Sequence, residues 1–292
     1  MATPVKQKDV NRPGRIRSGW LLAKMSWRVL MLDKELIVFP LLSGLSCLLI
    51  LAGFAGGIWA SGVGQQESEP VNQSVAVAVM FAWYFLNFFV IVFFNAALIA
   101  CAIIRFKGGD PTVGDGMRAA GERIAQITAW ALVASTVGML LRIIEDRMEF
   151  VGRIMAGLLG AAWTIATFLV VPVLVVEKIG PIDAFKRSTE IIRKTWGESL
   201  VSNIGIGVIA VLVSMLILIG GGIGVGMLYT QTQSLVVLVA GIGTIVALLI
   251  LVSLASSALS SIVLSALYLY AAEGKMPQAF QAAGAEGAFV SK

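Results

Sequence analysis

The chain has 292 residues, of which 58% are apolar and 13% are charged, whereas a soluble domain typically carries about 25% charged residues. Its 22 basic and 17 acidic residues avoid five stretches completely, and each stretch has the roughly 18 residues that a bilayer-crossing helix needs. This composition excludes an ordinary water-soluble enzyme and predicts an all-α polytopic membrane protein. The charge-free stretches are 36–66, 70–104, 124–141, 154–176 and 199–272.

The first 35 residues contain an amphipathic pattern ahead of the first charge-free run. Apolar residues recur there at spacings of four and three, while Arg17, Lys24 and Arg28 occupy another face. Such a pattern predicts a helix that lies on the cytoplasmic surface of the membrane. The apolar stripe consists of Ile16, Trp20, Ala23, Trp27 and Leu30.

The charge-free runs predict six membrane-spanning helices, because the longest run splits at a polar cluster between Tyr229 and Ser234. The predicted spans are 38–61, 75–103, 124–144, 154–176, 201–226 and 235–270. Pro172 is expected to kink the fourth span. The sixth span, from Leu235 to Tyr270, would be about 54 Å long against a hydrocarbon core of about 30 Å. It must therefore tilt steeply, break near its serines, or continue beyond the bilayer under cover of other protein.

A surface helix is predicted before each pair of spans, so the chain reads as three units within one membrane domain, 1–292. Before the fifth span, Pro181 suits a first helical position, and Ile182, Phe185, Ile192 and Trp196 form an apolar stripe among charges that pair at i, i+4. A weaker helix spans 115–123. The expected segments are 1–35, the hairpins 38–103, 112–176 and 181–272, and a tail, 273–292.

The basic residues set the expected orientation. The segments on one side of the six spans carry 19 Lys and Arg, and the other side carries only Arg142, Arg147 and Arg153. Because Lys and Arg are retained in cytoplasmic loops, both termini are expected in the cytoplasm. In the loop from Arg142 to Arg153, the charges at 142 and 146 and at 149 and 153 are spaced for self-pairing; an external selectivity ring is the alternative.

The spans themselves contain no Asp, Glu, Lys, Arg or His in their apolar cores, which argues against a proton relay or ion-coupled uptake. The polar residues left within the spans include Asn87 and Asn95, on one face of the second span. The fifth and sixth spans contain small residues, glycines and serines, at helical spacing. These small residues favour helix packing or a subunit interface, and a polar permeation path is the alternative. They are Gly220, Gly222, Gly224, Gly226, Ser253, Ser257, Ser261 and Ser265.

The chain contains no histidine, the commonest metal ligand and the side chain that most readily moves protons near neutral pH. Cys47 and Cys101 lie in apolar runs without the spacing of a zinc or redox motif. We therefore expect no metal, no cofactor and two reduced thiols, with lipidation of Cys101 as an alternative. No nucleic-acid-binding motif accompanies the net charge of +5.

Short motifs near the start and in the middle of the chain carry a family resemblance. The opening reads Ser18-Gly19-Trp20, Ser26-Trp27-Arg28, Asp33-Lys34-Glu35-Leu36 and Phe39-Pro40-Leu41-Leu42-Ser43-Gly44. The middle reads Val171-Pro172-Val173, Glu177, Ala184-Phe185-Lys186-Arg187-Ser188 and Trp196-Gly197-Glu198. These motifs resemble an uncharacterised family of bacterial multi-span integral membrane proteins, a domain of unknown function. The resemblance implies a bacterial inner-membrane protein and no particular activity.

Three functions are compatible with these patterns. The first is a non-enzymatic, homo-oligomeric protein that organises lipid or a partner complex. Its lipid or partner surface would consist of Trp20, Trp27, Arg28 and Trp196. Alternatively, the surface helices that carry these residues only anchor and orient the spans at the membrane interface. The second is a channel or facilitator for an uncharged or amphipathic solute. The third, an intramembrane enzyme, would depend on serine or on surface acids such as Asp33 and Glu35, and no paired base is visible. We expect the first.

Overall fold

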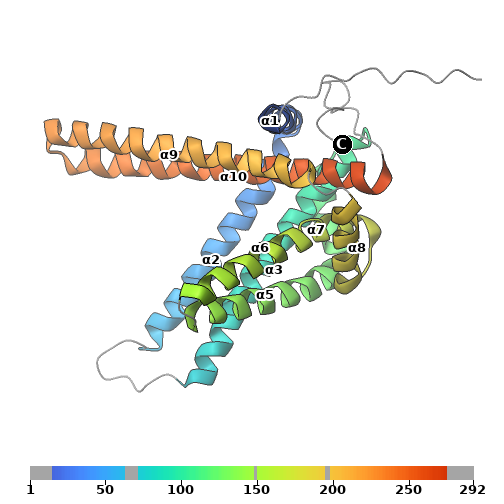
Figure 1. The fold of residues 1–292 in the computed structure, drawn as a ribbon. Coiled ribbons are helices and arrows are strands. Elements are labelled where there is room, and N and C mark those ends of the chain that lie inside the picture. Colours follow the sequence, from blue (N-terminus) through green and yellow to red (C-terminus); the bar gives the residue numbers. More distant parts are fainter. Residues whose placement is uncertain (1–14, 63–71, 148–149, 195–197, 275–292) are drawn as a thin grey trace, which may run out of the picture. The chain divides into compact units, whose positions relative to one another are not determined.

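The computed structural model describes residues 15–62, 72–147, 150–194 and 198–274, and these residues are almost entirely helical, with no strand among them. Figure 1 shows the helices in chain order. They are α1 (Arg15–Leu32), the short 3-10 helix η1 (Lys34–Ile37), α2 (Val38–Ala60), α3 (Gln73–Phe106), α4 (Val113–Gly121), α5 (Ile124–Arg147), α6 (Phe150–Thr167), α7 (Val170–Glu177), α8 (Pro181–Lys194), α9 (Glu198–Thr232) and α10 (Leu235–Glu273).

Six helical segments of the described residues are long and apolar enough to cross a membrane, and they coincide with the six predicted spans. They are Lys34–Ala60, Gln73–Phe106, Ile124–Asp146, Gly152–Glu177, Gly207–Thr232 and Leu235–Ala272. The expected all-α membrane fold is therefore confirmed. Orientation, the side on which the termini lie and the kind of membrane stay predictions.

The chain divides into two compact units, which are described separately. One unit is Asp33–Lys194, and the other consists of Met1–Leu32 with Thr195–Lys292. In the first unit, which we call the bundle, α3 is central and contacts α2, α4, α5 and α7. Its second half supplies much of the buried core, in a run from Ala96 to Ile103.

Aromatic rings connect three helices of the bundle. The ring of Trp130 on α5 stacks on that of Trp163 on α6, with centroids 5.9 Å apart and planes 13° apart. Trp163 in turn stacks on Phe185 of α8, with centroids 5.7 Å apart and planes 24° apart. Both separations fall within the range in which aromatic pairs attract beyond their area burial. The three stacked rings thus hold α8 against α5 and α6.

The fourth predicted span is two helices rather than one kinked helix. α6 ends at Thr167 and α7 begins at Val170. Pro172 is the third residue of α7, a position where a missing backbone N–H breaks no helical hydrogen bond. A proline ring clashes with the carbonyl four residues earlier, here that of Phe168, so the helix ends before the proline instead of bending around it.

The second unit contains α1, α9 and α10, and α1 contacts both of the long helices. α9 and α10 form a hairpin that turns at Gln233, which has a positive φ of 49°. Both helices are continuous: α9 runs through Gly220–Gly222, and α10 runs unbroken through its serines for 39 residues. The alternative that the sixth span breaks near its serines is therefore wrong.

The three predicted surface helices are present as α1, α4 and α8, and each contacts other helices of its own unit. α4 lies mainly on α3 of the preceding hairpin, and α8 contacts α5, α6 and α7. α1 contacts the last hairpin, α9 and α10. Order in the sequence thus predicts these helices, but it does not predict their packing partners.

Candidate functional site

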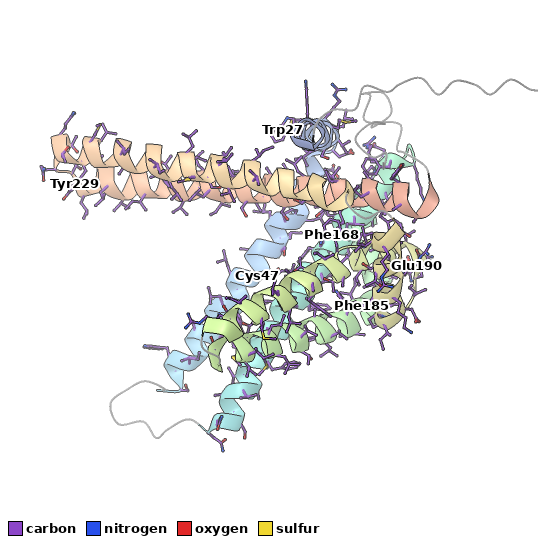
Figure 2. All side chains as sticks on the ribbon, in the orientation of Figure 1. Trp27, Cys47, Phe168, Phe185, Glu190 and Tyr229 are labelled. Atoms are coloured by element: carbon purple, nitrogen blue, oxygen red, sulfur yellow. The ribbon has the colours of Figure 1, made fainter. Side chains whose placement is uncertain are left out.

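The outward face of α1 combines cations with large apolar side chains. Lys24, Trp27, Arg28 and Met31 are exposed at helical spacings, and 48% of the Trp27 surface is accessible. The opposite face, which includes Val29 and Leu30, is buried. The prediction that Trp27 shares an apolar stripe with Leu30 is wrong, because Leu30 is buried whereas Trp27, labelled in Figure 2, is exposed. Lys24 and Arg28 are exposed at neighbouring positions of the same helix. An exposed tryptophan between two cations is typical of a membrane interface.

The other predicted members of the lipid or partner surface are less well defined. Trp20 belongs to α1, but its side chain is outside the described residues, as is Trp196 entirely. The described face is therefore Lys24, Trp27, Arg28 and Met31, which we call the α1 basic face.

α8 presents a different surface. Its buried face contains Ala184, Ser188 and Ile191, whereas Ile182, predicted on the apolar stripe, is exposed. Its exposed side chains include two acids and two bases, and Lys186 pairs with Asp183 at i, i+3, as Arg187 does with Glu190. The side chain of Lys194, the predicted i, i+4 partner of Glu190, lies outside the described residues. α8 thus has a charge-balanced outer face, unlike α1. The exposed charged residues are Asp183, Lys186, Glu190 and Arg193.

Arg187 connects α8 to the end of α7. Its Nε donates to Glu177 Oε1 at 3.1 Å, and its Nη1 donates to Glu190 Oε2 at 3.1 Å. These bonds, first that to Glu177 and then that to Glu190, raise the pKa of the guanidinium. The cation is therefore held between two carboxylates, and Arg187 is part of the attachment of α8, not of a free basic surface.

Ser188 closes the break between α6 and α7. Its hydroxyl donates to the Ala166 carbonyl at 2.8 Å and accepts from the Leu169 N–H at 3.2 Å. The side chain is fully buried. A helix break in hydrocarbon is tolerated only where other protein groups satisfy the freed backbone, and here a serine from another helix does so. Ser188 was noted in the sequence only as part of a family motif.

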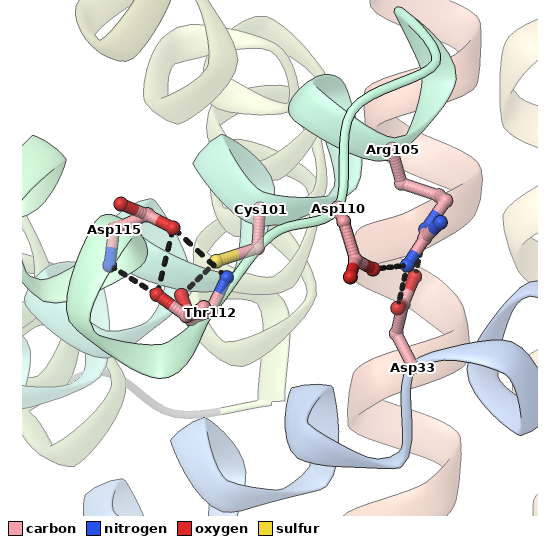
Figure 3. Close-up of polar contacts among 6 residues, drawn as sticks. All are labelled: Asp33, Cys101, Arg105, Asp110, Thr112 and Asp115. Atoms are coloured by element: carbon pink, nitrogen blue, oxygen red, sulfur yellow. Dashed lines mark hydrogen bonds and ion pairs between the residues drawn. The ribbon is translucent and has the colours of Figure 1, made fainter.

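Arg105, in the last turn of α3, joins two acids in the bundle (Figure 3). Its guanidinium donates two hydrogen bonds to Asp33 and one to Asp110. The Asp33 side chain is only 6% exposed, whereas that of Asp110 is 92% exposed. The bidentate pair with Asp33 ties the start of the first span to the end of the second. Asp33 is therefore a buried structural acid and not the surface acid that the enzyme hypothesis named.

α4 is seated tightly on α3 through a glycine. A Cβ at Gly116 would lie 2.6 Å from Phe39 Cζ, 2.7 Å from Cys101 Sγ and 2.8 Å from the Ala97 carbonyl oxygen. Cys101 is buried, and its thiol donates to the Thr112 carbonyl at 3.4 Å (Figure 3). A buried thiol offers no surface for an acyl group, so this packing contradicts lipidation of Cys101.

A capping box starts α4. The Thr112 hydroxyl accepts from the Asp115 N–H at 3.2 Å, and Asp115 Oδ2 accepts from the Thr112 N–H at 3.0 Å and from its hydroxyl at 2.7 Å. These bonds, that from the hydroxyl first, lower the pKa of Asp115. The helix predicted at 115–123 thus begins earlier, at Val113, and the Thr-x-x-Asp pattern at Thr112 and Asp115 is the sequence signal of its start.

The predicted glycines of the last hairpin face open space within the chain. A Cβ at Gly220, Gly222, Gly224 or Gly226 would meet no atom within 4 Å. The close approaches between α9 and α10 are instead at Gly221, where a Cβ would lie 2.9 Å from Ile245 Cγ1, and at Gly241 against Val225. The four predicted glycines therefore do not pack α9 on α10, and their use between subunits stays a prediction.

The predicted serines divide into two groups along α10. Ser253 and Ser257 are exposed and line a groove between α9 and α10, whereas Ser261 and Ser265 are buried. The hydroxyl of Ser261 donates to the Ser257 carbonyl at 3.0 Å, and that of Ser265 donates to the Ser261 carbonyl at 2.8 Å. A single continuous serine stripe is therefore not presented to one surface.

The two candidate path residues are both half-buried on α3. The Asn87 amide donates to the Trp83 carbonyl of its own helix at 2.8 Å. Among the described residues, no group of three or more Cys, Asp and Glu side chains is placed to hold a metal ion. In the last turns of α5, Arg142 pairs as predicted with Asp146, at 3.2 Å, while Glu149 lies outside the described residues.

Comparison with known proteins places this arrangement of helices in a family. No curated protein matches the sequence. The model of a family of unknown function, DUF6159, matches residues 74–278, which is well over half of the chain. The matched region begins at α3 and extends through α10. The expectation of an uncharacterised family is thus confirmed, and the chain belongs to the family of unknown function DUF6159.

Proposed function

We propose that this membrane protein is non-enzymatic, assembles with further copies of itself and organises lipid at its surface. The observation that carries the proposal is the exposure of the last hairpin. Of the described residues, none in the most apolar 18 of α9 or α10 is buried within the chain, whereas half of those in α3 are. Apolar side chains are covered equally well by lipid and by another helix. The polar groups of the hairpin therefore decide whether lipid or a second copy of the chain covers it.

Five serines line the groove between α9 and α10, which has a volume of about 610 Å³. They are Ser214, Ser253, Ser256, Ser257 and Ser260. Lipid tails offer no hydrogen-bond partner to a hydroxyl, whereas a helix from a second copy offers carbonyls and hydroxyls, and small side chains let it approach closely. The groove therefore supports self-association more than contact with lipid.

The lipid part of the proposal is supported by the α1 basic face. Lys24 and Arg28 attract anionic headgroups, while Trp27 and Met31 can enter the boundary between headgroups and acyl chains. α1 contains no acidic residue that would oppose this attraction. Its partners would thus be anionic membrane lipids. The non-enzymatic part is supported by the sequence, which has no histidine and no charge in the apolar cores.

Native mass spectrometry of the gently extracted protein tests the proposal. We expect a mass of two or more chains with retained anionic phospholipid. Ser257→Leu should fill the serine groove and lower the mass to that of one chain. Gly243→Leu is the matched control, because it adds the same side chain to α10 at a site with open space outside the groove. A single-chain mass for the unaltered protein would contradict self-association.

A channel or facilitator is the second candidate, and the hydroxyls of the same groove are the observation in its favour. Asn87 contributes less than the sequence suggested, because its amide bonds to its own helix. Flux of an uncharged solute such as glycerol into liposomes that contain the protein separates the two candidates. Flux through the unaltered protein that Ser257→Leu abolishes would favour the facilitator. Flux with the unaltered protein equal to that of empty liposomes would favour the role in organising lipid.

A further inference from the structure

The surroundings of α10 change along its length. From Leu235 to Ser257 no residue is buried, and Leu235 and Val236, next to the turn of the hairpin, are 69% and 76% exposed. From Ser261 to Leu269 every residue is buried, so protein covers all faces of the helix there. The first part of α10 therefore presents an apolar surface to its surroundings, and the part from Ser261 to Leu269 presents none.

α10 is too long to lie entirely within the hydrocarbon core of a membrane. Its 39 residues make a helix about 58 Å long. A tilt of about 40°, the upper end of the range for transmembrane helices, reduces the distance that it spans to about 44 Å. The hydrocarbon core is about 30 Å thick. Tilt alone therefore does not fit α10 into the core, and one of its ends must lie outside.

Burial decides which end of α10 lies outside the core. Val236 and Val239, near the turn, are 76% and 63% exposed, and apolar surface left in water costs about 25 cal/mol for each Å². The stretch from Ser261 to Leu269 avoids this cost, because protein already covers it. The remaining stretch, from Leu235 to Ala258, is about 36 Å long and crosses the core with a modest tilt.

The contacts between α9 and α10 place the same edge on α9. A Cβ at Gly221 would touch Ile245, and a Cβ at Gly241 would touch Val225. These two contacts have the same antiparallel register, and this register puts Val208 of α9 level with Ala258 of α10. Val208 is 51% exposed, like the apolar residues that follow it on α9. From this level to the turn, both helices of the hairpin are thus apolar and exposed.

α1 lies across the hairpin, towards the end away from the turn. It contacts both α9 and α10, and Figure 1 shows it end-on while the two long helices run across the view. A helix that crosses two spans lies along the membrane surface, and the α1 basic face suits headgroups there.

We infer that the hydrocarbon core ends at the level of Ala258 and Val208, with α1 among the headgroups. The stretch from Ser261 to Leu269 then lies outside the core, within protein, although it is as apolar as a span. This inference goes beyond the proposed function, because it concerns the depth of the hairpin and holds whether lipid or a second copy lies beside it.

Water contact along the hairpin tests the inference. p-Acetylphenylalanine is introduced at one exposed position at a time and coupled to a hydroxylamine nitroxide, a reaction that leaves Cys47 and Cys101 unchanged. In vesicles of phosphatidylcholine and phosphatidylglycerol in D₂O, electron spin echo modulation by deuterium measures the water around each label. All positions are exposed and outside the serine groove; they are Met31, Val208, Ile219, Val236 and Val246.

We expect the least water at Val246 and Ile219, which lie midway between the turn and the edge on the two helices. Val236 and Val208 should have more water, in similar amounts, and Met31 should match Val208. A core centred on the whole of α10 would instead make Val208 drier than Val246 and Val236 the wettest position. Less water at Val208 than at Val246, equal water at all five positions, or a bulk-water value at Met31 would overturn the inference.

Discussion

The bundle and the α9–α10 hairpin differ in what their small and polar residues contact, although Gly221 and Gly241 of the hairpin are closely packed. In the bundle, Gly116 is fixed against Phe39 and Cys101, and the Ser188 hydroxyl satisfies the backbone of another helix. In the hairpin, Gly222 faces open space, and Ser265 bonds within its own helix. The same residue types at helical spacing therefore indicate packing only where a neighbour is present, and substitutions in the two regions should differ in their effect on stability.

The largest loss of stability is expected from Arg105→Gln in the bundle. This change leaves the buried Asp33 carboxylate without its bidentate partner, and breaking a buried ion pair costs about 3 kcal/mol. Thermal unfolding in detergent measures the loss. Arg118→Gln, at an exposed position, is the control. The double variant Asp33→Asn/Arg105→Gln should lose less than the sum of the single changes; simple additivity would show that the two residues do not act as a pair.

The next effect is expected from Gly116→Ala, which should cost about 2 kcal/mol because the new Cβ overpacks α4 against α3. The carbonyl oxygen of Ala97, 2.8 Å from that Cβ, is backbone and cannot move aside cheaply. Gly121→Ala on the same helix meets no atom within 4 Å and should be neutral or stabilising. Chemical denaturation of both variants measures the difference. Equal stability of the two would mean that α4 is not seated on α3 as described.

Ser188→Ala should cost about 1 kcal/mol, because it leaves the Leu169 N–H and the Ala166 carbonyl without their shared partner. Hydrogen exchange at the amide of Leu169, the residue before α7, should accelerate more than exchange at the amides within α7. Thr189→Ala is the neighbouring control, since that hydroxyl bonds only within α8, to the Lys186 carbonyl at 2.7 Å. Unchanged exchange at Leu169 in Ser188→Ala would remove the role of the serine at the break.

The smallest effect, and one of opposite sign, is expected in the hairpin. Gly222→Ala should stabilise the isolated chain by about 0.5 kcal/mol, because alanine is the better helix former and its Cβ meets nothing within 4 Å. Thermal unfolding in a detergent that keeps the protein monomeric measures this gain. A loss comparable to that of Gly116→Ala would break the contrast between the two units and would reveal a contact of α9 within the chain.

The sequence predicts the spans well because charged side chains are costly in the hydrocarbon core of a membrane, so the spans are visible as charge-free stretches. The first span was expected at 38–61 and α2 is Val38–Ala60, and the sixth was expected at 235–270 and α10 is Leu235–Glu273. Polar termini were harder to place: α9 extends to Thr232 through residues that are uncharged but hydrophilic. A hydrogen-bonded helix continues through such residues as long as its backbone ladder is kept.

The packing partners and the buried polar contacts could not be predicted from the sequence. Asp33 and Arg105 are 72 positions apart, and no local period relates them, so Asp33 was interpreted as a surface acid. The face of α1 was also misassigned, because the spacing of Trp27 fits both an apolar stripe and a basic face. Only the position of the neighbouring helices decides which face is buried.

The stacked rings of Trp130 and Trp163 have an optical consequence. Two indoles with centroids 5.9 Å apart are close enough for their ultraviolet transitions to couple, and such coupling contributes to a circular dichroism spectrum a term that isolated indoles lack. Because the two residues come from α5 and α6, and Phe185 of α8 extends the stack, this signal is an intrinsic reporter of the bundle. It allows the bundle to be followed by spectroscopy in an intact membrane, without any label.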